Sequence, residues 1–232
     1  MIKAIIFDFG QTLVDSAKGF RMAEKVAKEK IYDTLKFHRK EINEQLFLKE
    51  YRRIRKSFHE ASNFSRVSIW DCVYKQFDHQ VELELLEQME DEYWNYVKQL
   101  TNPFPETIEV LGKLSQKYQL GLISNTQGQR TNAGHRMVLF PEIESYFNTI
   151  IVAGESGIPA KPNPQPFDLC LEQMQIKPAE AIYVGDDYRN DVCGSGDAGL
   201  QPVWLKHHLV QRNWPEVETT VKIIENLSEL LT

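Results

Sequence analysis

The chain opens on an apolar run that stops abruptly at an aspartate. Ala4-Ile-Ile-Phe is followed by Asp8 and by a turn that contains Gly10. A continuous apolar run of this length is typical of a strand that is covered on both faces in a parallel sheet. Open α/β sheets bind their ligands at the carboxyl ends of such strands. The position of Asp8 therefore predicts a ligand site at the end of the first strand.

Two later apolar runs also end in polar side chains. One of them, over residues 120–123, runs into Ser124 and Asn125, and the other, over residues 181–184, runs into a glycine and Asp186. If the three runs are parallel strands of one sheet, their polar ends meet at the same edge. This convergence favours an active site over three unrelated loops.

The chain beyond residue 100 alternates between strand-like and helix-like patterns. We expect strands at 120–123, 149–152, 181–184 and 202–205, and helices near 107–118, after 126, near 165–174, after 191 and near 231. Such alternation indicates βαβ units and a parallel sheet. The predicted fold class is α/β, with a Rossmann-like parallel-sheet core.

The segment between the first strand and this alternating region has a different pattern. Residues 16–100 contain no strand-like run and almost no glycine, and their apolar side chains recur at helical spacing, first at Phe20, Ala23, Ala27, Ile31 and Leu35. We therefore predict an all-helical cap subdomain over 16–100, inserted into a core made of 1–15 and 101–232. Because the insertion starts beside Asp8, it can close over the site.

Composition narrows the possible partners. The net charge of −6 leaves no basic excess to meet a nucleic-acid backbone, and no apolar run approaches the roughly 20 residues of a membrane-spanning helix. The short apolar start does not resemble a signal peptide. The three scattered cysteines show no metal-ligand spacing and neither do His207 and His208, so we expect reduced thiols and exposed histidines. We predict a cytoplasmic monomer or homodimer without nucleic-acid or membrane partners.

The carboxylates at the sheet edge indicate a metal. Asp8, Asp186 and Asp191 would lie too close together to remain ionised without a compensating cation. An oxygen-rich set of this kind suits Mg²⁺, which binds one or two carboxylates together with a phosphate. Groups that suit an anion lie in the same loops, namely Thr12, Ser124, the amides near Asn125, and Lys161. Together these groups favour phosphoryl chemistry, in which Asp8 attacks phosphorus and forms an aspartyl phosphate.

These segments resemble the four motifs of the haloacid dehalogenase superfamily, in the family's order. The resemblance covers Asp-Phe-Gly-Gln-Thr-Leu-Val-Asp-Ser at 8–16, Ser124 in Ile-Ser-Asn-Thr, Lys161 in Ala-Lys-Pro-Asn-Pro, and Gly-Asp-Asp-Tyr-Arg-Asn-Asp at 185–191. The ordered set spans the chain and is similar to the members with a helical cap after the first motif. The resemblance implies a Rossmann-like core, a helical cap and hydrolase activity of the phosphatase-like branch.

The resemblance also implies roles in metal binding. Asp8 would be both the nucleophile and a Mg²⁺ ligand, and Asp186 would be the second carboxylate ligand. Asp191 would bind the metal directly or through water, or would hold Lys161. The backbone carbonyl of Gly10 would complete the metal shell.

The remaining implied roles concern the phosphoryl group. Thr12 and Ser124 would donate hydrogen bonds to its oxygens, with Asn125 beside them in the substrate site. Lys161 would neutralise charge between the nucleophile and the phosphate. Positioning and charge stabilisation supply most of the catalysis in phosphoryl transfer.

One position departs from the family pattern. The family's phosphatases usually carry a second aspartate two residues after the nucleophile, and here that residue is Gly10. The missing group serves as general acid and base, which is worth ~10²–10⁴-fold in rate. The substrate could have an acidic leaving group, Gln11 or a cap residue could substitute, or turnover could be slow or absent. We favour a working phosphatase for a small phosphorylated metabolite; Gly10 argues against a phosphomutase.

Two other functions are compatible with parts of the pattern. A 2-haloacid dehalogenase shares the nucleophile but uses no metal and usually has a neutral residue in place of Asp186, and unpaired carboxylates here would cost several kcal/mol per buried ion. A catalytically weak binding or regulatory protein on the same fold is supported by Gly10 alone.

Overall fold

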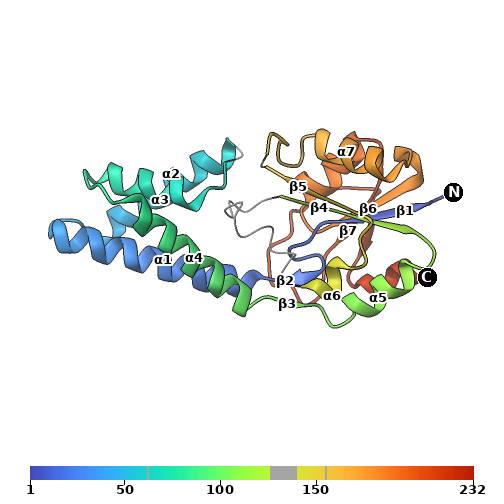
Figure 1. Cartoon of the computed structure of the whole chain (residues 1–232), viewed down its shortest axis with the longest axis horizontal. Helices are drawn as coiled ribbons and strands as arrows, with labels where there is room; N and C mark the ends of the chain where they lie inside the picture. Colours follow the sequence, from blue (N-terminus) through green and yellow to red (C-terminus); the bar gives the residue numbers. More distant parts are fainter. Residues whose placement is uncertain (62, 126–139, 155) are drawn as a thin grey trace. The chain divides into compact units, whose positions relative to one another are not determined.

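The computed structural model describes residues 1–61, 63–125, 140–154 and 156–232. Contacts divide them into two compact units (Figure 1). The described residues 1–17, 102–125 and those from 140 onward form one unit, and residues 18–101 form the other. The use of the second unit as a cap over the site, with boundaries at 15/16 and 100/101, stays a prediction.

The first unit is built on a parallel sheet of six strands in the order β5-β4-β1-β6-β7-β8 (Figure 1). The strands are β1 (Ala4–Phe7), β4 (Gln119–Asn125), β5 (Thr149–Ala153), β6 (Ala181–Gly185), β7 (Gln201–Leu205) and β8 (Lys222–Ile224). Strand β1 lies between β4 and β6, and Phe7 is in register with Leu122 and Val184. The three polar strand ends therefore meet at one edge, and the α/β class is confirmed.

Helices cover both faces of the sheet. They are α5 (Thr107–Leu114), α6 (Pro141–Glu144), α7 (Gln165–Met174), a π-helical turn (Tyr188–Cys193) that continues into α8 (Gly194–Asp197), and short 3₁₀ helices at Pro178–Glu180 and Leu227–Leu231. Side chains alternate along a strand, so Ile5 and Phe7 pack with the residues of α5, and Ala4 and Ile6 pack with those of α7. This double cover explains the continuous apolar run of β1.

Some elements differ from the sequence expectation. The helix expected after Asp191 already begins at Tyr188, and the helix expected after residue 126 lies outside the described residues. Strand β8 is not predicted from sequence because it has only three residues, two of them exposed. Shorter still are β2 (Val14–Asp15) and β3 (Asn102–Pro103), which form a separate antiparallel pair.

The second unit is helical throughout its regular structure, as expected. In the part that is described, its helices are α1 (Ala17–His38), α2 (Glu44–Glu60), α3 (Arg66–Gln76) and α4 (Leu83–Gln99). The predicted face of α1 is buried at Ala23, Ala27, Ile31 and Leu35. At Gly19 an added Cβ would lie 2.8 Å from the carbonyl oxygen of Val97, so α1 and α4 approach closely only because this residue is glycine. No helix described in either unit is long and apolar enough to cross a bilayer.

His207 is fully buried, so the prediction that it is exposed is wrong, whereas His208 is exposed as expected. The His207 ring stacks on Phe104 with centroids 3.7 Å apart, and Nε2 lies 2.7 Å from Oε1 of Glu106. Its Nδ1 accepts a hydrogen bond from the amide of Leu209 at 3.2 Å. Nε2 therefore carries the proton and donates it to Glu106, a partner 101 positions away that spacing cannot reveal.

This environment predicts a pH-dependent stability. Burial lowers the pKa of His207 below its ordinary 6.5, although Glu106 and Asp15 oppose the shift and His208 adds to it. The unfolded chain thus binds a proton on His207 more readily than the folded protein does. The contribution of the neutral His207 to the free energy of unfolding is therefore full above about pH 6.5, and it is lost as the pH falls through the lower pKa of the folded state. When the pH is lowered from about 7 to about 5, the free energy of unfolding in urea should fall less for His207→Gln than for the wild type, because glutamine does not titrate. Equal losses would contradict a neutral buried imidazole.

Candidate active site

Three carboxylates converge at the carboxyl edge of the sheet. Asp8 follows β1, Asp186 follows β6, and Asp191 lies in the π-helical turn after β6. One oxygen of each lies within 4.8 Å of the others, and Asp186 and Asp191 are 5% and 1% exposed. They meet because β1 and β6 are neighbours in the sheet. The structure thus brings together the three residues predicted to bind a metal.

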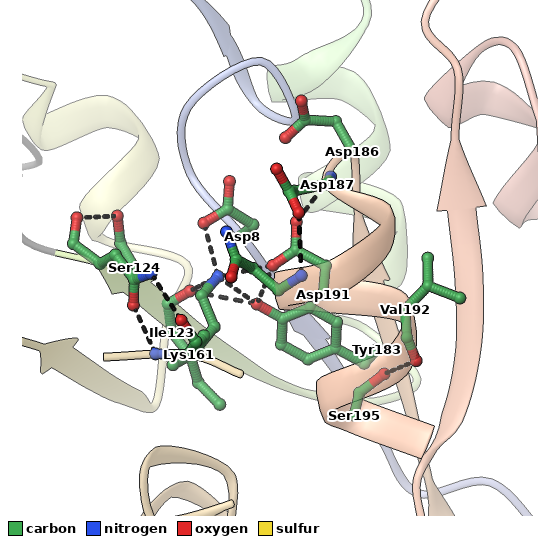
Figure 2. A network of polar contacts seen from close by, with 12 residues as sticks. Asp8, Ile123, Ser124, Lys161, Tyr183, Asp186, Asp187, Asp191, Val192 and Ser195 are labelled. Atoms are coloured by element: carbon green, nitrogen blue, oxygen red, sulfur yellow. Dashed lines mark hydrogen bonds and ion pairs between the residues drawn. The ribbon is translucent and has the colours of Figure 1, made fainter. Parts of the chain in front are cut away.

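The ammonium group of Lys161 lies between two of these carboxylates, those of Asp8 and Asp191 (Figure 2). Its Nζ lies within hydrogen-bond distance of four oxygens, which its three N–H groups share. These are Asp8 Oδ1 at 2.8 Å, Asp191 Oδ1 at 2.7 Å, the Tyr183 hydroxyl at 2.7 Å and the Ile123 carbonyl at 2.9 Å. Burial alone would lower the pKa of Lys161, but the carboxylates of Asp191 and Asp8 outweigh it and the pKa is raised. The lysine is therefore a permanent cation that bridges two acidic side chains.

Asn125 fixes the backbone of this lysine. Its Oδ1 accepts from the Lys161 amide at 2.8 Å, and its Nδ2 donates to the Lys161 carbonyl at 3.2 Å. Both ends of the side-chain amide are thus used to hold the loop of Lys161 against the end of β4. The structure gives Asn125 a positioning role, and its predicted contact with substrate stays a prediction.

Asp191 has partners on both carboxylate oxygens. Oδ1 accepts from Lys161 and from the Tyr183 hydroxyl, the latter at 3.2 Å, and Oδ2 accepts from the amide of Asp187 at 2.9 Å. Of the roles implied by the resemblance, these contacts favour the one in which Asp191 holds Lys161. The side chain also lies directly against Gly185, where an added Cβ would be 2.4 Å from its Cγ.

The close contact predicts a large effect of Gly185→Ala. The added methyl group must push Asp191 out of its bonds with Lys161 and Asp187, because the contact is far below any van der Waals distance. We expect a loss of about 1–3 kcal/mol in urea unfolding, as for other overpacked sites, together with weaker Mg²⁺ binding in calorimetry. Gly196→Ala is the control, since the nearest atom to its Cβ is 3.9 Å away. Wild-type metal affinity in Gly185→Ala would contradict the packing argument.

Two hydroxyl groups, predicted to contact a phosphoryl group, have unused hydrogen-bonding capacity. Thr12 is fully buried, and its Oγ1 has no hydrogen-bond partner among the described residues. Ser124 is the penultimate residue of β4 and lies beside the lysine network (Figure 2). Its Oγ makes only a long contact of 3.5 Å to the Asn125 carbonyl in the part of the chain described. Their contact with a phosphoryl group stays a prediction.

The site carries more negative charge than its own cations neutralise. Burial raises the pKa of Asp186 well above its usual range; Asp191 and Asp8 add to the rise and Arg212 opposes it. Burial also raises the pKa of Asp191, against Lys161. Clustered carboxylates of this kind remain ionised only beside further positive charge. The donor set, hard oxygens within 4.8 Å of one another, fits Mg²⁺.

Comparison with known proteins identifies the family. A family model described as haloacid dehalogenase-like hydrolase matches residues 5–205. The chain belongs to this family. The predicted resemblance is confirmed, and this haloacid dehalogenase-like hydrolase has relatives in sequence that carry phosphatase names. The glyceraldehyde 3-phosphate phosphatase of Methanothermobacter thermautotrophicus is 27% identical over 236 residues, which cover 99% of this chain and 98% of the relative.

Solved structures share the fold of this haloacid dehalogenase-like hydrolase. The 2-haloacid dehalogenase of Pseudomonas syringae pv. Tomato DC3000 has a TM-score of 0.71 at 22% identity and covers 100% of this chain and 97% of its own. The HAD-hydrolase YfnB of Bacillus subtilis, which is bound to magnesium, has a TM-score of 0.61 at 19% identity, with 99% and 96% coverage. At these identities the likeness shows the fold alone.

Two residues of the haloacid dehalogenase-like site are missed by sequence reasoning. Tyr183 lies within β6 and its pattern is that of a core residue, yet its hydroxyl contacts Lys161 and Asp191. Arg212 follows β7 in a segment without periodicity, and its Nη1 donates to Oδ2 of Asp186. The alternation of side chains along β6 could have placed Tyr183 on a defined face, but no local signal indicates Arg212.

Proposed function

We propose that the protein is a Mg²⁺-dependent phosphatase that hydrolyses a small phosphorylated metabolite through an aspartyl phosphate on Asp8. The observation that carries this proposal is the bridge from Lys161 to Asp8 and Asp191, with Asp186 close by. A carboxylate beside a fixed ammonium group and further acidic oxygens suits attack on phosphorus near a divalent cation. The phosphatase names of the relatives support the same class of reaction.

The residues present allow two displacement steps. The ion pair with Lys161 holds Asp8 by Oδ1, and the other carboxylate oxygen attacks phosphorus. The bond to the leaving oxygen breaks as this bond forms, and the leaving group departs as an anion that takes a proton from solvent. A water then attacks phosphorus, which releases phosphate and restores the carboxylate of Asp8. The proton of the attacking water goes to solvent. Thr12 and Ser124 donate to the phosphoryl oxygens. Mg²⁺ held by Asp8, Asp186 and the Gly10 carbonyl would neutralise charge on the phosphoryl oxygens.

Gln11 is a poor substitute for the missing acid. Its Oε1 accepts from the Ser16 amide at 2.7 Å and from the Ser16 hydroxyl at 3.3 Å. Its Nε2 lies 3.4 Å from Oδ1 of Asp15. Both ends of the side chain are thus engaged at the start of α1, which supports an acidic leaving group as the reason that Gly10 is tolerated.

A preference for acidic leaving groups predicts how Gly10→Asp changes specificity. An aspartate at this position restores a proton donor, which matters most when the leaving alkoxide is strongly basic. We expect turnover of alkyl phosphates to rise by about tenfold or more, within the ~10²–10⁴-fold range of general acid catalysis, and turnover of aryl and acyl phosphates to change little. Gly10→Asn should give no gain, because asparagine has the shape of aspartate but no acidic proton to give to the leaving group. Equal gains on all substrates would contradict the explanation.

Phosphate release from a panel of compounds tests the proposed function. The panel contains p-nitrophenyl phosphate, acetyl phosphate, glyceraldehyde 3-phosphate, and other sugar and nucleotide phosphates, each with Mg²⁺ and with a chelator. We expect turnover that needs the metal, with a preference for acidic leaving groups. Absence of turnover on every compound by a folded protein would contradict the proposal. In that case chloride release from 2-chloropropionate tests the dehalogenase alternative.

A further inference from the structure

Arg212 forms an ion pair with Asp186, the carboxylate of the cluster with which Lys161 forms no ion pair. Its Nη1 donates to Oδ2 of Asp186, while Lys161 pairs with Asp8 and Asp191. In the described part of the chain, Arg212 is the one basic side chain that forms an ion pair with Asp186. Each of the three carboxylates thus has a basic partner before any metal is bound, although two cations serve three carboxylates.

The ion pair between Arg212 and Asp186 competes with a metal for the same carboxylate. Oδ2 of Asp186 belongs to a carboxylate that has an oxygen within 4.8 Å of oxygens of Asp8 and Asp191, close enough for all three to hold one ion. A hydrogen bond from a guanidinium group occupies one of the carboxylate's lone-pair sites, through which a metal could also bind. Two positive charges at one carboxylate also repel each other in a buried site. Metal and guanidinium therefore cannot both be bound to this carboxylate at full strength.

Groups other than Asp186 lie close enough to bind the Arg212 side chain. Its guanidinium carbon lies 4.8 Å from the centre of the Trp214 ring, and Nη2 lies 4.0 Å from Oδ2 of Asp187. The side chain is 35% exposed and lines an open pocket together with Lys206, Asn213, Trp214, Pro215 and Glu216. Asp187 and the ring can hold the guanidinium group after it leaves Asp186, without any change in the sheet.

We propose that Arg212 is a built-in competitor for the divalent cation: it holds Asp186 while the metal is absent and moves toward Asp187 and Trp214 when the metal binds. This inference rests on the metal site of the proposed function. It assigns Arg212 a positioning role that lowers the metal affinity and keeps the acidic cluster folded in the absence of metal. The chemical class of the ligand that displaces it is a hard divalent cation, Mg²⁺ or Mn²⁺.

Isothermal titration of MgCl₂ into the metal-free protein, without substrate, tests the competition. We expect Arg212→Gln to bind Mg²⁺ about tenfold more tightly than the wild type, equivalent to about 1.4 kcal/mol. Arg189→Gln is the matched control, because Arg189 is exposed and makes no ion pair among the described residues. Its affinity should stay within about twofold, since exposed charges are screened. Unchanged or weaker binding by Arg212→Gln overturns the proposal.

Tryptophan fluorescence tests the movement separately. Mg²⁺ should change the emission of the wild type because the guanidinium group shifts at the Trp214 ring, and the change should vanish in Trp214→Phe and in Arg212→Gln. A change that persists in both variants, or that is absent from the wild type, overturns the movement. Both assays omit substrate, so a protein that binds Mg²⁺ without releasing phosphate would refute the phosphatase and still decide the role of Arg212. If no variant binds Mg²⁺, the competition is refuted.

Discussion

Asp8→Asn is expected to abolish phosphate release and leave the protein folded. The amide cannot form the bond to phosphorus, and removal of a catalytic nucleophile lowers turnover by roughly 10⁴-fold or more. The fold should tolerate the change, because Asn keeps the shape and an oxygen that accepts from Lys161. Loss of one negative charge also relieves the repulsion by Asp186 and Asp191. Phosphate release at saturating Mg²⁺ and urea unfolding measure the two effects.

A matched control separates chemistry from charge. Asp168→Asn makes the same change on the exposed surface of α7 and should keep wild-type turnover. Retention of more than about a tenth of the activity by Asp8→Asn would contradict the nucleophile assignment, because it exceeds what positioning alone supplies. Unfolding of Asp8→Asn would instead show that Asp8 has a structural role.

Lys161→Met is expected to destabilise the protein more than any other single change considered. It leaves the buried carboxylate of Asp191 and the partly buried carboxylate of Asp8 without their shared cation. Breaking a buried ion pair by removal of one partner costs about 3–5 kcal/mol. Urea unfolding measures the loss, and added Mg²⁺ should restore part of it because a cation returns to the cluster. Phosphate release should also fall, since no other side chain among the described residues holds the carboxylate of Asp8 in the same way.

The control for this variant is an exposed lysine with one acidic partner. Lys113→Met removes an ion pair with Glu109 on the surface of α5, which is worth at most about 0.5 kcal/mol. A loss of less than about 1 kcal/mol in Lys161→Met would contradict the view that this lysine neutralises the acidic cluster. Lys161→Arg should be destabilised as well, because a planar guanidinium group cannot replace a compact ammonium group with four oxygens around it.

The parts of the site predicted from sequence are those tied to the strands. Asp8, Ser124 and Asp186 each end a buried apolar run, so the parallel sheet alone brings them to one edge. The motif around Lys161 indicated this lysine from the sequence, but the hydrogen bonds between its backbone and Asn125 required the structure. The fold class could also be predicted, because the alternation of strands and helices along the chain indicates a parallel sheet.

The parts that were missed depend on long-range contacts of irregular segments. Arg212 and His207 lie after β7, where no periodicity constrains the chain, and their partners Asp186 and Glu106 are 26 and 101 positions away. Periodicity describes which face a residue takes within an element. It carries no information about where a loop places its side chains, so these two contacts required the structure.

Trapping of the phosphorylated enzyme tests the central claim most directly. The protein is mixed with Mg²⁺ and the best substrate of the panel, quenched in acid within the first turnover, and treated with borohydride, which reduces an acyl phosphate to an alcohol. Peptide mass spectrometry should then find homoserine in place of Asp8, dependent on Mg²⁺ and absent when substrate is omitted. Rapid phosphate release with an unmodified Asp8 peptide at every quench time would contradict the aspartyl-phosphate mechanism.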